Sequence, residues 1–115
     1  MSLLKNPVIL ALDVDDREEA VQLVLPLAST LGAIKIGPRL INKYGMTLVQ
    51  ELAKLAPVFI DNKYFDIPST MLAAVKQCFD AGATLVTVHA LSGSEALSQL
   101  AQLEKELNKT RPFKI

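Results

Sequence analysis

Short apolar runs recur along the chain at intervals of 24 to 28 residues. Residues 8–14 (VILALDV), 33–37 (AIKIG), 57–63 (PVFIDNK) and 84–90 (TLVTVHA) are rich in aliphatic and β-branched side chains, and a fifth run, PFKI, begins at residue 112. Runs of this length and composition, separated by segments with helical spacing, are typical of β-strands. The pattern therefore predicts four strands and the beginning of a fifth.

The first segment between these runs carries signals for a helix. Asp15 and Asp16 precede residues 17–30 (REEAVQLVLPLAST) and are candidate N-caps, followed by acidic residues in the first turn. Pro26 should kink or interrupt this helix. Gly32 is a suitable residue to end it.

The next two segments are also predicted to be helical. Residues 38–55 form the second, which we expect to break near Gly45 because KYGMT reads as a turn. Residues 68–81 form the third, which Pro68 opens and Gly82 closes.

The fourth helix should start at Ser92, where S-G-S-E matches a capping box with Glu95, and should run to about Asn108. Strands and helices thus alternate, which favours parallel strands with covering helices. Two α/β architectures fit this alternation: a (β/α)8 TIM barrel and a doubly wound open sheet.

Each predicted strand turns polar at its C-terminal end on one face. Because side chains alternate along a strand, one face of the sheet carries a common set at that end: Asp13, Lys35, Asp61, Lys63 and His89. Polar groups on four successive strands fit the C-terminal rim of a closed barrel, where active sites of that fold lie. No G-x-G-x-x-G follows the first strand, which weakens a dinucleotide-binding interpretation.

The chain is short for a complete barrel. A whole (β/α)8 barrel needs about 250 residues, and this sequence has 115. We therefore expect residues 1–115 to be a single partial domain, the N-terminal half of a TIM barrel: (βα)4 plus the start of strand five. A half barrel exposes unpaired strand edges, so we expect a C-terminal half as a companion fragment, or self-association.

Composition narrows the class of protein. Twelve Lys and Arg residues balance twelve Asp and Glu residues, so the formal net charge is zero. The composition therefore does not indicate binding to nucleic acid or to an anionic membrane surface. No apolar stretch is long enough for a membrane span. Cys78 is the single cysteine and His89 the single histidine, so no internal disulfide and no common His/Cys zinc site is possible. A reducing cytoplasm is the expected location.

The rim charges suggest a chemistry. Alternating lysines and aspartates can satisfy one another as a structural ion-pair network, or they can serve catalysis. The carboxylates could hold Mg²⁺. Without metal, a lysine among carboxylates keeps its proton and can donate it. A neighbouring carboxylate could repel a substrate carboxylate while the lysine stabilises an incipient carbanion, which suits decarboxylation followed by protonation at carbon.

Residues 61–70, DNKYFDIPST, resemble the D-x-K-x-x-D-I-P-x-T pattern of the orotidine 5′-phosphate decarboxylase family. The segments ALDVD, KIGPRLINKYG and VTVHA are also similar to that family, in the same order and spacing. The D-x-K-x-x-D core alone is shared with Mg²⁺-dependent sugar-phosphate decarboxylases and aldolases of a wider suprafamily. Ile67, Pro68 and Thr70 favour the orotidine enzyme.

The resemblance implies a cofactor-free reaction from orotidine 5′-phosphate to uridine 5′-phosphate and CO₂ in pyrimidine biosynthesis. Lys63 would donate the proton to C6, and Asp61 would lie beside the substrate carboxylate and order the lysines. Lys35 would join this network and contact the ribose. Asp13 would bind a ribose hydroxyl.

The resemblance also implies a homodimer with shared active sites. Asp66, Ile67 and Thr70 would reach into the partner subunit's site, and His89 would line the pocket. The phosphate-binding groups of the family lie beyond Ile115. The chain alone is therefore expected to be inactive, and a non-catalytic half-barrel module remains an alternative.

Overall fold

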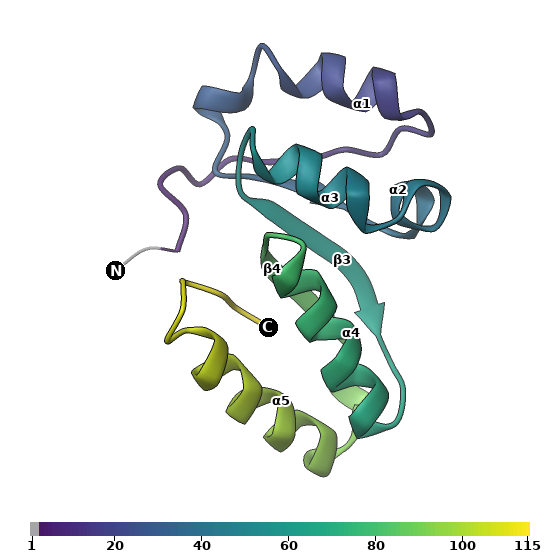
Figure 1. The fold of residues 1–115 in the computed structure, drawn as a ribbon, viewed down its shortest axis with the longest axis vertical. Helices are drawn as coiled ribbons and strands as arrows, with labels where there is room; N and C mark the ends of the chain where they lie inside the picture. The colour runs from purple at the N-terminus through teal and green to yellow at the C-terminus, as the bar shows by residue number, and fades with distance from the viewer. Residues whose placement is uncertain (1–2) are drawn as a thin grey trace.

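The computed structural model describes residues 3–115 and contains one sheet of four parallel strands. The strands are β1 (Ile9–Ala11), β2 (Ala33–Ile36), β3 (Val58–Tyr64) and β4 (Ala83–Val88), and their order in the sheet follows the chain (Figure 1). A doubly wound sheet reverses its strand order at a switch point. The sheet has no such reversal within residues 3–115, so the predicted barrel arrangement is confirmed.

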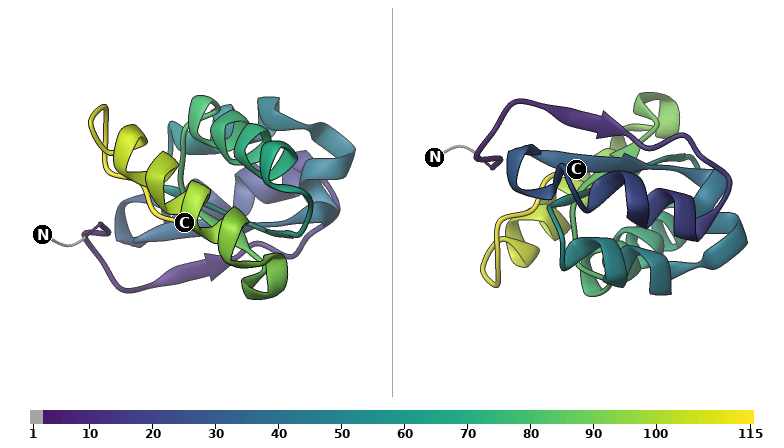
Figure 2. Two further views of the ribbon diagram at one scale, coloured as in Figure 1. Left: turned by 90° about the horizontal axis from the view of Figure 1, so that it is seen from below. Right: turned by 90° about the horizontal axis from the view of Figure 1, so that it is seen from above.

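Helices connect each strand to the next. They are α1 (Arg17–Val24), the short 3₁₀ helix η1 (Ala28–Thr30), α2 (Pro38–Tyr44), α3 (Met46–Ala53), α4 (Pro68–Asp80), the 3₁₀ helix η2 (Ala90–Ser92) and α5 (Ser94–Leu107). Crossovers between parallel strands are right-handed, so a sheet that grows in one direction has all its helices on one face. Figure 2 shows these helices beside the sheet from two opposite directions.

Burial differs between the two faces of the sheet, and it alternates from Ile34 to Ile36 in β2 and from Val58 to Asp61 in β3. The strand residues that face the helices are almost fully buried: Ile34, Ile36, Val58, Ile60 and Val86. They pack with helix residues such as Leu52 and Val75 in a single hydrophobic core. The alternate residues, including Lys35 and Thr87, are partly exposed on the other face, which is the inner face of the half barrel.

The inner face and one edge of the sheet are open. Ile9 in the edge strand β1 is 39% exposed although it is a large apolar residue. At the other side, the last residues run parallel to β4 through a bridge between Leu85 and Lys114, with hydrogen bonds from Lys114 N to Thr84 O and from Val86 N to Lys114 O at 3.0 Å each. This bridge is the predicted start of strand five.

The first helix differs in part from its prediction. Asp16 is the N-cap of α1, and its side chain accepts a hydrogen bond from Glu19 N. The prediction that Asp15 also acts as a cap is wrong, because its carboxylate pairs with Arg39 at 3.3 Å. The helix ends at Val24, two residues before Pro26, because proline has no N–H to donate and its ring clashes with the preceding turn. Gly32 therefore does not end it.

The predicted capping box at α5 is wrong. The N-cap is Gly93, with φ at 98°, and no side chain caps the helix. The Ser92 hydroxyl instead donates to His89 O at 2.6 Å, within the turn that forms η2. Glu95 accepts from Gln99 one turn later. The 3₁₀ turn uses the serine before the α-helix begins.

The remaining helix predictions are confirmed. A break separates α2 from α3 at Gly45, whose φ of 72° lies in the region that favours glycine. Pro68 is the first residue of α4, which ends at Asp80. Within residues 3–115 we find no helix with the length and hydropathy of a membrane span.

Candidate active site

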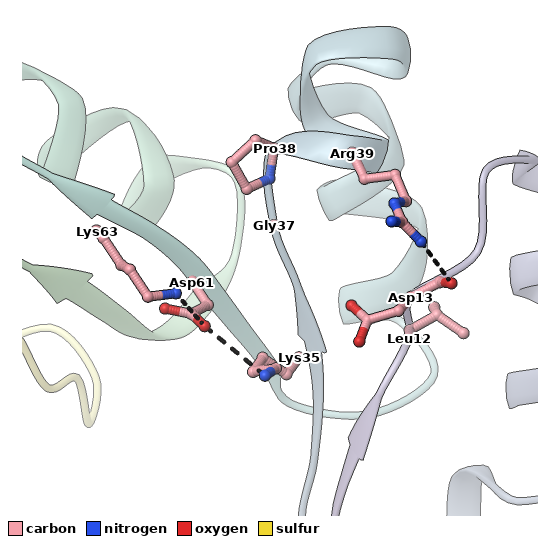
Figure 3. A pocket seen from close by; sticks show the side chains of 8 residues that line it. All are labelled: Leu12, Asp13, Lys35, Gly37, Pro38, Arg39, Asp61 and Lys63. Carbon is pink, nitrogen blue, oxygen red and sulfur yellow. Dashed lines mark hydrogen bonds and ion pairs between the residues drawn. The ribbon is translucent and has the colours of Figure 1, made fainter.

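Three charged side chains meet on the inner face of β2 and β3. Asp61 Oδ2 lies 2.8 Å from Lys63 Nζ and 3.7 Å from Lys35 Nζ. The Asp61 side chain is only 16% exposed, whereas Lys63 is 67% exposed. The carboxylate is thus the inner member of the array, and both ammonium groups approach the same oxygen (Figure 3). The sequence prediction that residues 35, 61 and 63 converge is confirmed.

These residues line a pocket at the carboxyl ends of the first three strands. Asp13 enters it from the end of β1, and Figure 3 shows its carboxylate pointing toward the same space as Lys35 and Asp61. Gly37 and Arg39, from the β2–α2 junction, complete one side. The pocket therefore collects groups from separate strands, as the rim of a barrel does.

Gly37 permits a close approach at the pocket floor. A Cβ atom on this residue would lie 3.1 Å from Asp61 O. A side chain here would require the neighbouring main chain to shift by a few tenths of an ångström. The glycine therefore lets the Asp61 main chain lie against the first turn of α2.

Arg39 is a pocket residue that the sequence analysis did not identify. One guanidinium nitrogen donates to Asp13 O at 3.1 Å, and Nε lies 3.3 Å from Asp15 Oδ1. The arginine thus ties the β1–α1 loop to the start of α2 (Figure 3). Its position directly after Gly37-Pro38 carries no signal of its own, because the loop that it holds is remote in sequence.

The main chain of Lys63 adopts a left-handed conformation, with φ at 49°. Among residues 3–115 it is the single non-glycine residue with positive φ, and such a conformation costs roughly 1–2 kcal/mol for an L-residue. The pairing of β3 with β4 is irregular at this point, between Ile60 and Tyr64. Irregularities of this type redirect side chains next to active sites.

Thr87 on β4 contacts both ends of this irregular segment. Its hydroxyl donates to Asp61 Oδ1 at 2.7 Å and accepts from Lys63 N at 3.0 Å. The sequence analysis did not select this residue. An isolated threonine in a strand gives no functional signal, although its position on the inward face could have drawn attention to it.

Hydrogen bonds and nearby positive charge lower the pKa of Asp61. The largest effect is the hydrogen bond from Lys63, partly opposed by desolvation, and the Thr87 hydrogen bond and the charges of Lys63 and Lys35 lower the pKa further. The carboxylate is therefore ionised at neutral pH. A fixed negative charge beside two ammonium groups is the arrangement that the sequence predicted.

The other candidate residues lie outside the pocket of Asp61, although Lys63 also borders the hollow that Asp66 and Thr70 line. Asp66 Oδ1 accepts from Ile67 N at 2.7 Å, and Asp66 and Thr70 line a second hollow beside α4. Ile67 is 63% exposed. The ring of His89 stacks on Phe65 with centroids 4.7 Å apart. The structure does not bring these four candidates into the pocket of Asp61.

A row of polar groups lies behind β3, on the helix side. Asn62 Nδ2 donates to the Tyr64 hydroxyl at 2.9 Å, and that hydroxyl lies 3.3 Å from Cys78 Sγ. Burial raises the pKa of Tyr64 to about 12 and also raises the pKa of the Cys78 thiol. These groups pack between the sheet and α4, and Cys78 is a buried core residue.

Among the described residues no three His, Cys, Asp or Glu side chains converge as metal ligands. The chemistry that this chain itself offers is that of ammonium groups ordered by a carboxylate. A protonated lysine held in this way can donate a proton, and the carboxylate can repel a negative group placed beside it.

The chain is similar to known proteins over most of its length. The sequence matches the Orotidine 5′-phosphate decarboxylase / HUMPS family over residues 6–112. It is 37% identical over 105 residues to an orotidine 5′-phosphate decarboxylase of Methanosarcina barkeri. The aligned residues make up 91% of this chain and 48% of the relative.

Solved structures show the same relation. An orotidine 5′-monophosphate decarboxylase of Methanocaldococcus jannaschii superposes with a TM-score of 0.83 at 30% identity, over 93% of this chain and 53% of the other. The same enzyme complexed with the inhibitor BMP gives a TM-score of 0.81 at 31% identity, over 90% and 49%. The chain thus spans about half the length of the relatives that it matches, and it belongs to the orotidine 5′-phosphate decarboxylase / HUMPS family.

Proposed function

We propose that this chain carries the charged half of an active site that converts orotidine 5′-phosphate to uridine 5′-phosphate and CO₂. One observation carries the proposal: Lys35 and Lys63 approach the same oxygen of Asp61 at the carboxyl ends of adjacent strands. Membership of the family, and relatives that are named as this decarboxylase, support the choice of reaction.

Lys63 is the proposed proton donor. The bond between C6 of the pyrimidine and the carboxylate carbon breaks, CO₂ leaves, and the electron pair stays at C6. A proton from Lys63 Nζ then forms the new C–H bond, and the neutral amine regains a proton from solvent. The side chain of Lys63 is 67% exposed, so its ammonium group can reach a substrate. The ion pair with Asp61 fixes where that group lies before the proton is transferred.

Asp61 has two proposed roles. Its ionised carboxylate stands beside the substrate carboxylate and disfavours the ground state, while the same negative charge keeps both ammonium groups in place. Loss of CO₂ removes the repulsion as the carbanion forms. Lys35 is proposed to contact the ribose, and Asp13 to bind a ribose hydroxyl from the end of β1.

The proposed reaction needs no cofactor and is a step of pyrimidine biosynthesis in the cytoplasm. A single free cysteine, buried at Cys78, is compatible with a reducing compartment. Covering half the length of its relatives, this partial domain of residues 1–115 is proposed to work with a C-terminal half barrel that binds the phosphate. Remote binding of that phosphate would supply energy for the chemical step, so the chain alone is expected to be inactive.

We further propose a homodimer with shared sites. Asp66, Ile67 and Thr70 would reach into the partner's pocket. His89, which lies outside the pocket of Asp61 in this half barrel, would line the wall of the completed pocket. Support comes from an apolar set on the strand-to-helix loops that includes Phe65, Ile67 and Leu91, which are 61%, 63% and 77% exposed. Exposed apolar side chains near polar ones are typical of protein interfaces.

The proposal is tested by joining the chain to the C-terminal half barrel of a family member and following the loss of orotidine 5′-phosphate. The joined protein should turn over the substrate, and residues 1–115 alone should not. A joined protein that is folded by circular dichroism, binds uridine 5′-phosphate and still shows no turnover would contradict the proposed reaction.

Chelation separates this reaction from the alternatives. Activity that survives EDTA supports the cofactor-free decarboxylase, whereas activity that EDTA abolishes supports a Mg²⁺-dependent sugar-phosphate decarboxylase or aldolase of the same suprafamily. The intact mass of the purified material reports on a companion fragment. A single species near 12.5 kDa that self-associates and has no activity with either substrate class would indicate a non-catalytic half barrel.

A further inference from the structure

The Thr87 hydroxyl has its hydrogen bonds fixed by its two partners. The N–H of Lys63 can only donate, so the hydroxyl oxygen accepts there, at 3.0 Å. The ionised carboxylate of Asp61 can only accept, so the hydroxyl hydrogen points at Oδ1, at 2.7 Å. One small side chain therefore joins the carboxylate of the array to the main chain of its lysine.

The sheet geometry explains why a bridge is required here. Ile60 pairs with Val86, and Tyr64 pairs with Val88. Three residues of β3, from 61 to 63, thus lie opposite Thr87 alone. The segment bulges from the sheet and carries Lys63 in its left-handed conformation. A threonine hydroxyl bonds the N–H of the bulged lysine at this point, where the regular ladder is interrupted.

The bridge also orients the carboxylate. Thr87 engages Oδ1 of Asp61, and this turns the other oxygen, Oδ2, toward Lys63 and Lys35. Without the hydroxyl, Oδ1 would have no partner from β4 and the carboxylate could rotate. The ammonium groups of Lys63 and Lys35 would then lose their fixed positions, because both pair with Oδ2 of this carboxylate.

We propose that Thr87 is a positioning residue that sets the orientation of the Asp61 carboxylate and the main-chain conformation of Lys63, and so places the proton donor for the reaction. This inference rests on the proposed function of that pair. Thr87 acts through its two neighbours and does not itself touch the reacting atoms.

The test compares Thr87→Val, which keeps the shape and removes the hydroxyl, with Thr87→Ser, which keeps the hydroxyl. Thr84→Val is the matched control, because Thr84 lies in the same strand and its side chain makes no hydrogen bond within residues 3–115. The first readout is the titration of the Asp61 carboxyl carbon by NMR in the 115-residue chain.

The hydroxyl is one of several groups around Asp61. Lys35 on β2 and Lys63 on β3 carry positive charge, and Asp13 and Arg39 line the same pocket. All four are unchanged in the variants, so a shift reports the loss of the bridge. We expect the Asp61 pKa to rise in Thr87→Val and to stay as in the unmodified chain in Thr87→Ser and Thr84→Val.

The second readout uses the joined barrel described above. In Thr87→Val, kcat should fall by about tenfold to a hundredfold because the proton donor is misplaced, while KM changes by less than about threefold because substrate-binding groups remain. Thr87→Ser should restore most of kcat. A mere packing defect would not be rescued by the smaller serine.

The outcomes separate this inference from the proposed function. An Asp61 titration unchanged in Thr87→Val overturns the role of Thr87, as does an equal loss of kcat in Thr87→Val and Thr87→Ser. If the Asp61 pKa changes as expected but the joined barrel has no decarboxylase activity, only the proposed reaction is overturned and the role of Thr87 stands. If Thr87→Val does not fold, Thr87→Ala makes the same comparison.

Discussion

Asp61 Oδ2 lies 2.8 Å from Nζ of Lys63, two residues further along the same strand. Residues at this spacing share a face of a strand, so the pair is local in sequence. Its environment is not local, because Lys35 comes from β2 and the Thr87 hydroxyl from β4. The ion pair thus depends on the packing of three strands.

Asp61→Asn should lower the free energy of unfolding at pH 7, because it leaves two ammonium groups together without their counter-charge. The fold depresses the pKa of Asp61 below its usual value near 3.8. The stabilisation by the carboxylate is therefore full above that value and is lost as the pH falls through the lower, folded pKa. Urea unfolding at pH 7 and at about pH 2.5 measures the difference.

The control for this prediction is Asp80→Asn. Asp80 pairs with Lys76 on the surface of α4, where both side chains are more than half exposed, so its removal should change stability by about 0.5 kcal/mol or less. A destabilisation of Asp61→Asn that is the same at both pH values would show that the charge of Asp61 does not stabilise the fold.

Tyr64 should make the fold sensitive to alkali. Burial raises its pKa to about 12, whereas the pKa of tyrosine in an unfolded chain is about 10. The contribution to stability is fully present below about pH 10 and is lost as the pH rises toward about 12, because the unfolded chain ionises first. Urea unfolding at pH 9 and pH 11 should show a smaller loss for Tyr64→Phe than for the unmodified chain. Equal losses would contradict the buried phenol.

Cys78 should be unreactive in the folded chain. The side chain is buried and burial raises the pKa of the thiol, so the reactive thiolate is scarce and inaccessible. Because the sequence has one cysteine, a thiol reagent reports this site alone. Modification at pH 8 should be slow in buffer and rapid in urea. Rapid modification in buffer would show that α4 does not pack on β3 as described.

Asp66→Asn should impair the partner's site if the sites are shared. Mixing Asp66→Asn with Lys63→Ala in the joined barrel would then form hybrid dimers with one intact site each. Random exchange of subunits should restore about a quarter of the unmodified activity. Activity that stays at the level of the separate variants after exchange, verified by native mass spectrometry, would argue against shared sites.

Much of the fold follows from local signals in the sequence. The alternation of apolar runs and helices, the interruption at Pro26 and the break at Gly45 depend on the residues at those positions. The capping box at Ser92 failed because a 3₁₀ turn competed for the same hydroxyl, which bonds His89 O. A capping pattern does not reveal which of two adjacent turns will use its serine.

The alternation of side chains along the strands was enough to predict the charged part of the site. Lys35, Asp61 and Lys63 share one face because of their spacing, and parallel neighbours bring their strand ends together. The role of Thr87 could not be predicted, because it depends on an irregular register between β3 and β4. Register is set by tertiary packing of both strands, and no single strand encodes it.

The central claim, that Lys63 is the proton donor, is tested most directly by Lys63→Ala in the joined barrel. We expect kcat to fall by at least about a hundredfold, while the Kd for uridine 5′-phosphate changes by less than about threefold. Lys76→Ala, at an exposed lysine of α4, should leave both values unchanged. Equal losses of turnover and nucleotide affinity in Lys63→Ala would contradict the claim.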